Sequence, residues 1–103
     1  MARLKTIYLD VATHLLEQRD RFTSRAIRTE FELDPEKKAV SIDPADSVFL
    51  TPVLDGRFTV IWSLDEPNQA ATVQAVLPLT NVDPHAPGLR DYIKRALQAE
   101  MKG

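Results

Sequence analysis

The chain contains no cysteine and only three glycines among its 103 residues. Without cysteine it has no disulfide bond, no thiolate nucleophile and no cysteine-ligated zinc or iron–sulfur site. Gly56, Gly88 and Gly103 lie too far apart to form a glycine-rich phosphate-binding loop. Serines are present, but none lies in a Gly-x-Ser-x-Gly pattern. We therefore expect a protein that is not an enzyme and that uses no cofactor, metal ion or small-molecule substrate.

Long hydrophobic runs are also missing, because the longest apolar stretch is far shorter than a membrane span. The N-terminal residues enter an amphipathic pattern without the apolar region of a signal peptide. Apolar residues make up 44% of the chain and charged residues 27%, as in ordinary globular proteins. The length suits one hydrophobic core. We expect a single cytoplasmic domain over residues 1–103 that makes no membrane contact.

The charges are unevenly spread, although the formal net charge is only −2. Residues 1–28 hold six Lys and Arg against three Asp and Glu, and residues 84–103 hold four against two. Residues 29–83 hold three against ten. Proteins that bind nucleic acid by charge alone are basic as a whole, so this distribution favours a protein partner.

Two helices are expected in the first third of the chain. Apolar residues recur at helical spacing over about residues 3–19: Leu4, Ile7, Tyr8, Val11, Ala12, Leu15 and Leu16. A second, shorter helix is expected over about residues 24–31, with Thr23 or Ser24 as its N-cap. A competing interpretation makes residues 28–33 a strand, since apolar and charged residues alternate there.

The middle of the chain has the two-residue period of strands. We expect a turn at residues 34–38, a strand at 39–42, a hairpin of strands 47–54 and 57–64, and a third long strand at 71–79. Pro52 cannot donate a ladder hydrogen bond, which favours a bulged turn that pairs Pro52 with Phe58. A proline-rich connector over residues 81–88 precedes a C-terminal helix. The predicted fold class is α+β: an N-terminal helix, a short second helix and a C-terminal helix packed on an antiparallel β-meander of three or more strands.

The second face of this meander is too apolar to be fully wetted, and few elements remain to cover it. In the expected register it carries Phe49, Thr51, Val53, Thr59 and Ile61. We expect these residues to bind a protein partner or a second copy of the chain. The corresponding function is a small interaction module, such as an inhibitor, an adaptor or an assembly factor.

The alternative is a winged-helix-like DNA-binding regulator. It would use residues 22–38 as a helix-turn-helix and residues 55–57 as the wing, with phosphate contacts from Arg21, Arg25, Arg28, Lys37, Lys38 and Arg57. Glu32 stands where a small turn residue is usual, and Glu36 would face phosphates. These carboxylates make the alternative less favoured. Asp10, His14 and Glu17 lie one helical turn apart and could hold a metal ion, but we expect them to form a solvated flank.

Overall fold

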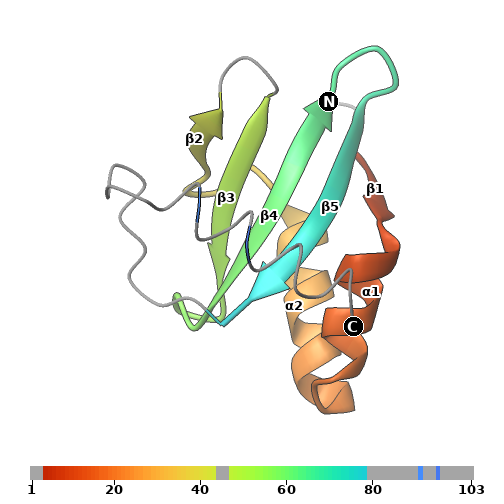
Figure 1. The fold of residues 1–103 in the computed structure, drawn as a ribbon, viewed down its shortest axis with the longest axis vertical. Helices are drawn as coiled ribbons and strands as arrows, with labels where there is room; N and C mark the ends of the chain where they lie inside the picture. Colours follow the sequence, from red (N-terminus) through yellow and green to blue (C-terminus); the bar gives the residue numbers. More distant parts are fainter. Residues whose placement is uncertain (1–3, 44–46, 79–90, 92–94, 96–103) are drawn as a thin grey trace.

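The computed structural model describes residues 4–43, 47–78, 91 and 95. The elements are, in chain order, β1 (Lys5–Tyr8), α1 (Asp10–Glu17), α2 (Arg21–Leu33), β2 (Val40–Asp43), β3 (Val48–Val53), β4 (Phe58–Asp65) and β5 (Ala70–Leu77). The strands form one five-stranded sheet, α2 covers one of its faces, and α1 lies beside α2 along β5 (Figure 1). Ala12 and Leu16 of α1 join the core on the α2 side, whereas Leu15 packs with residues of the opposite face. The architecture is thus a two-layer α+β domain.

The sheet has the strand order β1-β5-β4-β3-β2. The neighbours from β5 to β2 are antiparallel, as hairpins require, whereas β1 is parallel to β5 with Lys5 opposite Ala70 and Tyr8 opposite Val73. The first strand therefore lies beside the last described strand, and the intervening chain supplies both helices and the other strands (Figure 1). The parallel pair makes the sheet mixed.

The predicted fold class is wrong in two respects. The sheet is mixed and not an antiparallel meander, and the first described element is the strand β1 and not a helix, with both described helices between β1 and β2. The expected connector and most of the expected C-terminal helix lie outside the described residues, although Asp91 and Arg95 are both helical.

The prediction of one helix over residues 3–19 is also wrong, because its first part is β1. Leu4 and Tyr8 both pack against the hydrophobic core. Their separation of four residues fits the period of a strand as well as that of a helix, so it does not distinguish the two. The segment contains the β-branched residues Thr6 and Ile7, which favour a strand. At its end, the N–H of Leu9 donates to the carbonyl of Val73 on β5 at 3.0 Å. The ladder with β5 decides in favour of the strand.

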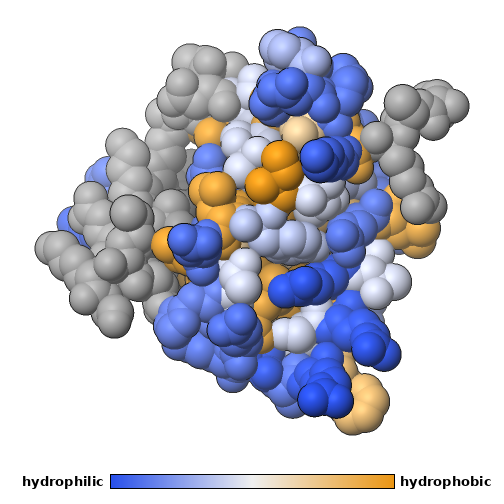
Figure 2. Space-filling view, turned by 90° about the vertical axis from the view of Figure 1, so that its right-hand side faces the viewer, coloured by the Kyte–Doolittle hydropathy of each residue, from blue (hydrophilic) through white to orange (hydrophobic). Residues whose placement is uncertain are grey.

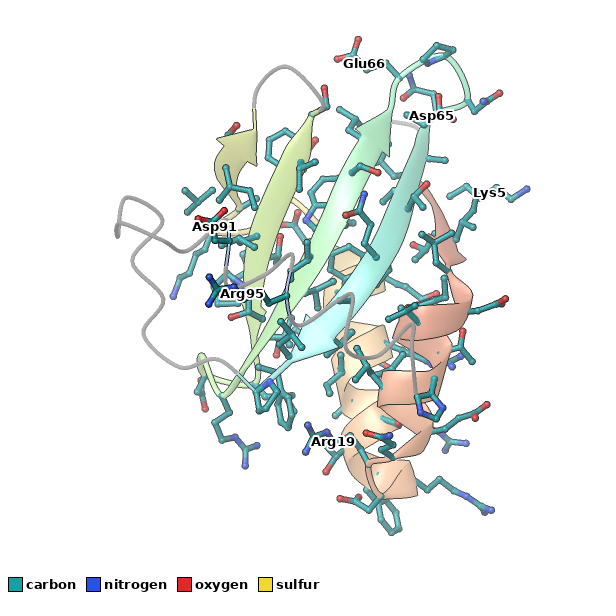
Figure 3. The ribbon with its side chains drawn as sticks, in the orientation of Figure 1. Lys5, Arg19, Asp65, Glu66, Asp91 and Arg95 are labelled. Atoms are coloured by element: carbon teal, nitrogen blue, oxygen red, sulfur yellow. The ribbon has the colours of Figure 1, made fainter. Side chains whose placement is uncertain are left out.

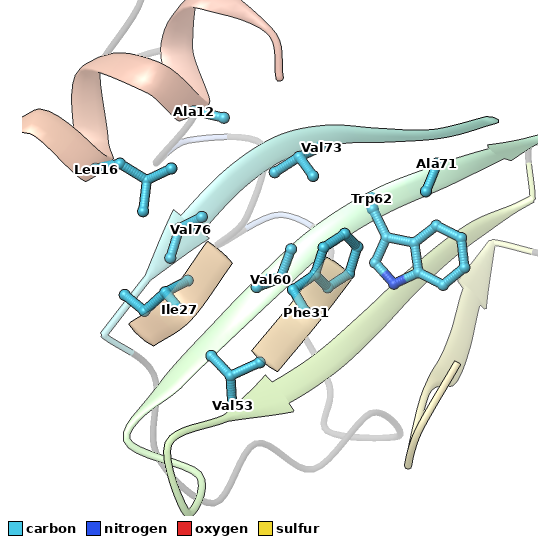
Figure 4. Close-up of a cluster of buried hydrophobic side chains, with 10 residues drawn as sticks. All are labelled: Ala12, Leu16, Ile27, Phe31, Val53, Val60, Trp62, Ala71, Val73 and Val76. Carbon is cyan, nitrogen blue, oxygen red and sulfur yellow. The ribbon is translucent and has the colours of Figure 1, made fainter. Parts of the chain in front are cut away.

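Helix α2 is longer than expected, and the competing strand over residues 28–33 does not form. Its N-cap is Asp20, not Thr23 or Ser24: the Asp20 carboxylate accepts the backbone N–H of Thr23 at 2.9 Å. Ile27 and Phe31, one turn apart, are buried against the sheet (Figure 4). The helix ends at Leu33, just before Asp34-Pro35, where the proline disfavours helical geometry in the residue that precedes it.

The β3–β4 hairpin does not adopt the bulged turn expected from Pro52. Pro52 lies opposite Thr59 and not opposite Phe58. Leu54, Asp55 and Gly56 all have positive φ angles, and the N–H of Arg57 donates to the carbonyl of Leu54 at 3.2 Å. The side chain of Glu30 on α2 accepts the N–H of Leu54 at 3.0 Å. This tight, helix-anchored turn outweighs the ladder hydrogen bond that Pro52 cannot make.

One tryptophan organises the core on the helix side of the sheet. The ring centroid of Trp62 lies 5.7 Å from that of Phe31 on α2 and 4.9 Å from that of Phe49 on β3. Its indole N–H donates to the hydroxyl oxygen of Thr51 at 2.8 Å, and that hydroxyl donates to the carbonyl of Pro35 at 2.6 Å. Figure 4 shows the surrounding buried side chains: Ala12, Leu16, Ile27, Phe31, Val53, Val60, Ala71, Val73 and Val76.

The hydroxyl of Thr51 is the middle of this hydrogen-bond chain, which gives a stability prediction. In Thr51→Val the buried indole N–H and the Pro35 carbonyl both lose their partner. We expect a loss of about 1–3 kcal/mol in the free energy of unfolding, measured by urea denaturation. Thr72→Val, at a half-buried threonine on β5, is the matched control and should change stability by less than about 0.5 kcal/mol. Equal losses in the two variants would contradict a special role for Thr51.

Lys38 gives a second prediction, because it is exposed and has a φ of 58°. The left-handed conformation costs a lysine about 1–2 kcal/mol but costs glycine almost nothing. Lys38→Gly should therefore raise Tm by a few degrees in a thermal denaturation experiment. The neighbouring Lys37→Gly should lower Tm, since Lys37 is exposed and has no positive φ angle to relieve. A fall in Tm for both variants would contradict this account.

Candidate partner-binding surface

Four large apolar side chains are exposed among the described residues. The exposed fraction is 41% for Ile7, 44% for Leu9, 85% for Phe22 and 67% for Leu33. Ile7 belongs to β1 and Leu9 directly follows that strand, whereas Phe22 and Leu33 belong to α2. These two groups mark separate places where apolar area is available to a partner.

The first place is the free edge of β1. In the described part of the chain, β1 has a strand neighbour only on the side of β5, and Figure 1 shows it as the outermost strand. The N–H groups of Lys5 and Leu9 donate to carbonyls at residues 69 and 73. Because alternate residues of a strand direct their N–H groups to opposite sides, those of Thr6 and Tyr8 point away from β5. Such an edge can pair with a further strand.

Side chains at this edge define its character. Ile7 and Leu9 are two residues apart and therefore lie on the same face. Lys5 is also exposed, and Figure 3 shows it at the outer margin of the sheet, pointing away from β5. A lysine on an edge strand limits indiscriminate pairing with other chains. The edge is thus suited to a specific partner strand rather than to aggregation.

The second place is the solvent-facing side of α2, opposite Ile27 and Phe31. Phe22 and Leu33 lie three helical turns apart on the same line along the helix. Ala26 and Thr29 lie between them on that line, so that these residues follow the spacing i, i+4, i+7, i+11. We name the four residues Phe22, Ala26, Thr29 and Leu33 the outer strip. Their spacing is that of a helix surface that packs against another helix.

A cationic hollow flanks the outer strip. It has a volume of about 420 Å³, and three arginines and two glutamates contribute to its wall. The lining residues are Leu16, Glu17, Arg21, Ser24, Arg25, Arg28, Thr29 and Glu32. The hydroxyl of Ser24 donates to the carbonyl of Leu16, which ties α2 to the end of α1. Figure 2 shows one side of the molecule as mostly hydrophilic side chains with small apolar patches between them. The arginines add positive charge beside the outer strip.

Tyr8 connects β1 to this helix. The guanidinium carbon of Arg28 lies 4.9 Å from the centroid of the Tyr8 ring, a cation–π contact. The Tyr8 hydroxyl is buried and makes no hydrogen bond of good geometry within the described part of the chain. Burial, and then the nearby charge of Glu32, raise the pKa of Tyr8 to about 12, against the smaller opposing effect of Arg28. The hydroxyl is protonated at neutral pH, as in any tyrosine, and the ring packs against Arg28.

The five residues expected to form a partner-binding face do not share one face. Phe49, Thr51 and Val53 lie on the helix side with Trp62, whereas Thr59 and Ile61 lie on the opposite side. All except the half-buried Phe49 are buried. The expectation of one exposed apolar face is wrong because the hairpin register differs by one residue, which moves β3 side chains to the other face.

The helix-turn-helix arrangement is not formed either. Where the recognition helix would begin, residues 35–38 form a turn that leads to β2, and Lys37 and Lys38 lie in that turn. Arg57 lies in the hairpin and donates from its Nε to the carbonyl of Leu54 at 3.2 Å. Only Arg21, Arg25 and Arg28 are brought together, in the cationic hollow. Asp10, His14 and Glu17 belong to no candidate metal cluster among the described residues, and His14 contacts Gln18.

Neither described helix combines the length and the apolar character that crossing a bilayer requires.

No protein-family model and no curated protein matches the sequence. Solved structures do match. A chain from the crystal structure of the toxin–antitoxin complex RelBE2 of Mycobacterium tuberculosis has a TM-score of 0.61 and 10% identity, with 75% of this chain and 99% of that chain covered. The fold of this chain resembles that of RelE. A chain from the archaeal RelE–RelB complex of Pyrococcus horikoshii has a TM-score of 0.59 and 12% identity, with 79% and 100% covered. At such identities the RelE-like character is a statement about fold alone.

The sequence pattern does not identify the edge residues Ile7 and Leu9, because the apolar spacing over residues 3–19 predicts a helix there. The signal that could have found them is the run Thr6-Ile7-Tyr8, which has high strand propensity and is followed by a separate helical pattern from Asp10.

The environment of Tyr8 predicts how stability depends on pH. The pKa of Tyr8 is raised in the folded chain, so the unfolded chain loses the phenolic proton first, near pH 10. The contribution of Tyr8 to stability is complete below pH 10 and is lost as the pH rises toward 12. Tyr8→Phe should remove this part of the alkaline decline in urea denaturation experiments. An unchanged decline between pH 10 and 12 would contradict the assignment.

Proposed function

We propose that this chain is a small, non-catalytic protein-interaction module that acts in the cytoplasm as one component of a two-protein complex of the toxin–antitoxin kind. The support is the RelE-like fold, because both similar chains come from structures of such complexes. The observation within this molecule that carries the proposal is the free edge of β1 with its exposed Ile7 and Leu9.

The mode of binding follows from the edge. A partner segment in extended conformation pairs with the outward N–H and C=O groups of β1, which supplies backbone hydrogen bonds. Ile7 and Leu9 supply apolar contact on one face of the added strand. Backbone pairing alone is not selective, so these two side chains and the charge of Lys5 distinguish the partner from other strands.

A binding role also suits the titratable groups near this surface. The pKa of Tyr8 is raised to about 12, still further from neutral pH than that of an ordinary tyrosine. A general base needs a pKa close to the working pH, which Tyr8 does not have. Its contact with Arg28 instead fixes β1 against α2, and a rigid edge loses little conformational entropy when a partner binds.

Leu9→Asp is the variant that tests this proposal. Leu9 is the N-cap of α1 and makes no side-chain capping bond, so an aspartate there should support the helix while it removes apolar contact. We expect at least a tenfold loss of partner affinity, about 1.4 kcal/mol, with an unchanged or higher Tm. The partner to be tested is the product of a gene adjacent to that of this chain, co-expressed with it, and the affinity is measured by isothermal titration calorimetry.

Phe22→Asp is the matched control, because it places the same charge at an exposed apolar position on α2 and not on β1. It should leave partner affinity unchanged. Wild-type affinity in both Leu9→Asp and Ile7→Asp would show that the partner does not bind at β1. Failure of both adjacent gene products to bind the wild-type chain would contradict the proposed function.

A further inference from the structure

We propose that a second copy of this chain packs on the outer strip of α2, with the two α2 helices antiparallel about a two-fold axis. This self-association goes beyond the proposed function, because it uses α2 and not the β1 edge. The starting observation is that Phe22 and Leu33 are the two most exposed large apolar side chains among the described residues. Both lie on one line of one helix.

The outer strip is accessible because the sheet occupies the other side of α2. Figure 4 shows Ile27 and Phe31 directed from α2 toward the strands, where both are almost completely buried. The outer strip lies about half a turn around the helix from them, and Thr29 and Leu33 are exposed. A second surface that covers the outer strip would remove the apolar area of Phe22 and Leu33 from water, which favours association.

The outer strip has the same order of large and small side chains when it is followed in either direction along α2. In an antiparallel pair whose two-fold axis passes between residues 27 and 28, Phe22 of one copy meets Leu33 of the other. Ala26 then meets Thr29. Large residues thus lie at both ends and small residues at the centre, where small side chains allow helix axes to approach to about 8 Å. An isologous interface requires this self-complementarity.

Charge favours the same arrangement. Arg25 and Glu32 are both exposed and lie on the same flank of the outer strip. In the antiparallel pair this flank faces the identical flank of the other copy. Arg25 of one copy then lies within about 3 Å, along the helix axis, of Glu32 of the other, and the contact occurs twice. Opposite charges at such flanking positions select the orientation of paired helices.

A parallel pair fits less well. It would direct Arg25 toward Glu30, the residue on the opposite flank of the outer strip. The carboxylate of Glu30 already accepts the N–H of Leu54 at 3.0 Å and is only half-exposed. The parallel pair would also place Phe22 of one copy against Phe22 of the other, and Leu33 against Leu33. The antiparallel pair leaves the Glu30 bond undisturbed.

Charge reversal tests the proposal directly, with sedimentation velocity over a concentration series of the full chain. Arg25→Glu alone and Glu32→Arg alone should each weaken dimerisation at least tenfold, because each places like charges together twice. The double variant R25E/E32R restores opposite charges and should return the dissociation constant to within about threefold of wild type. Lys37→Glu, an exposed charge reversal outside the strip, is the control and should change nothing.

Apolar contact is tested by Phe22→Asp and Leu33→Asp, both of which should be monomeric with unchanged circular dichroism. The proposal is overturned if the wild-type chain is monomeric throughout the series, if Phe22→Asp still dimerises as wild type, or if the double charge variant stays as weak as the single ones. The proposed function fails separately: Leu9→Asp should lose the partner and keep the dimer, whereas Phe22→Asp should lose the dimer and keep the partner.

The orientation has its own test, because the chain has no native cysteine. Chains with Ala26→Cys mixed with chains with Thr29→Cys should form a mixed disulfide-linked dimer on mild oxidation, since these positions face each other only in the antiparallel pair. Cross-linking only between like chains would indicate a parallel pair and overturn the proposed orientation.

Discussion

The fold depends on the chain of hydrogen bonds from Trp62 through Thr51 to the carbonyl of Pro35. Its three groups come from β4, from β3 and from the turn after α2, so one buried hydroxyl joins both layers of the domain. The indole ring also contacts Phe31 on α2 and Phe49 on β3. A buried indole N–H without an acceptor would be costly, which is why this network fixes α2 in one position over the sheet.

The surfaces left for binding are a consequence of that placement. Ile27 and Phe31 are used against the sheet, and the Glu30 carboxylate holds the hairpin through Leu54, so the outer strip of α2 is turned to solvent. The contact of Arg28 with Tyr8 brings β1 against the same helix. Because β1 pairs with β5 on one side, and no other described strand pairs with it, its other edge is the one that we propose for a partner. Core packing and the two proposed contacts are therefore parts of one arrangement.

The sequence predicts correctly those elements whose apolar residues repeat with the period of a strand or with that of a helix, but not with both. Strands β3, β4 and β5, with the turns after residues 53 and 65, lie close to their predicted positions, and α2 was recognised from Ile27 and Phe31. The first strand was missed because the spacing of Leu4 and Tyr8 suits a helix equally well. The faces of β3 were reversed because local proline chemistry at Pro52 suggested a register that the contact between Glu30 and Leu54 overrides. Long-range contacts of this kind leave no local pattern in the sequence, and so the candidate site could not be predicted from it.

The central claim is that a protein partner adds a strand to the free edge of β1. Amide hydrogen exchange at Thr6 and Tyr8 tests it most directly, since their N–H groups point away from β5. Both amides should exchange quickly in the free chain and be strongly protected in the complex, while the amides of Lys5 and Leu9 should be protected in both. Equal exchange of Thr6 and Tyr8 with and without the partner would contradict it.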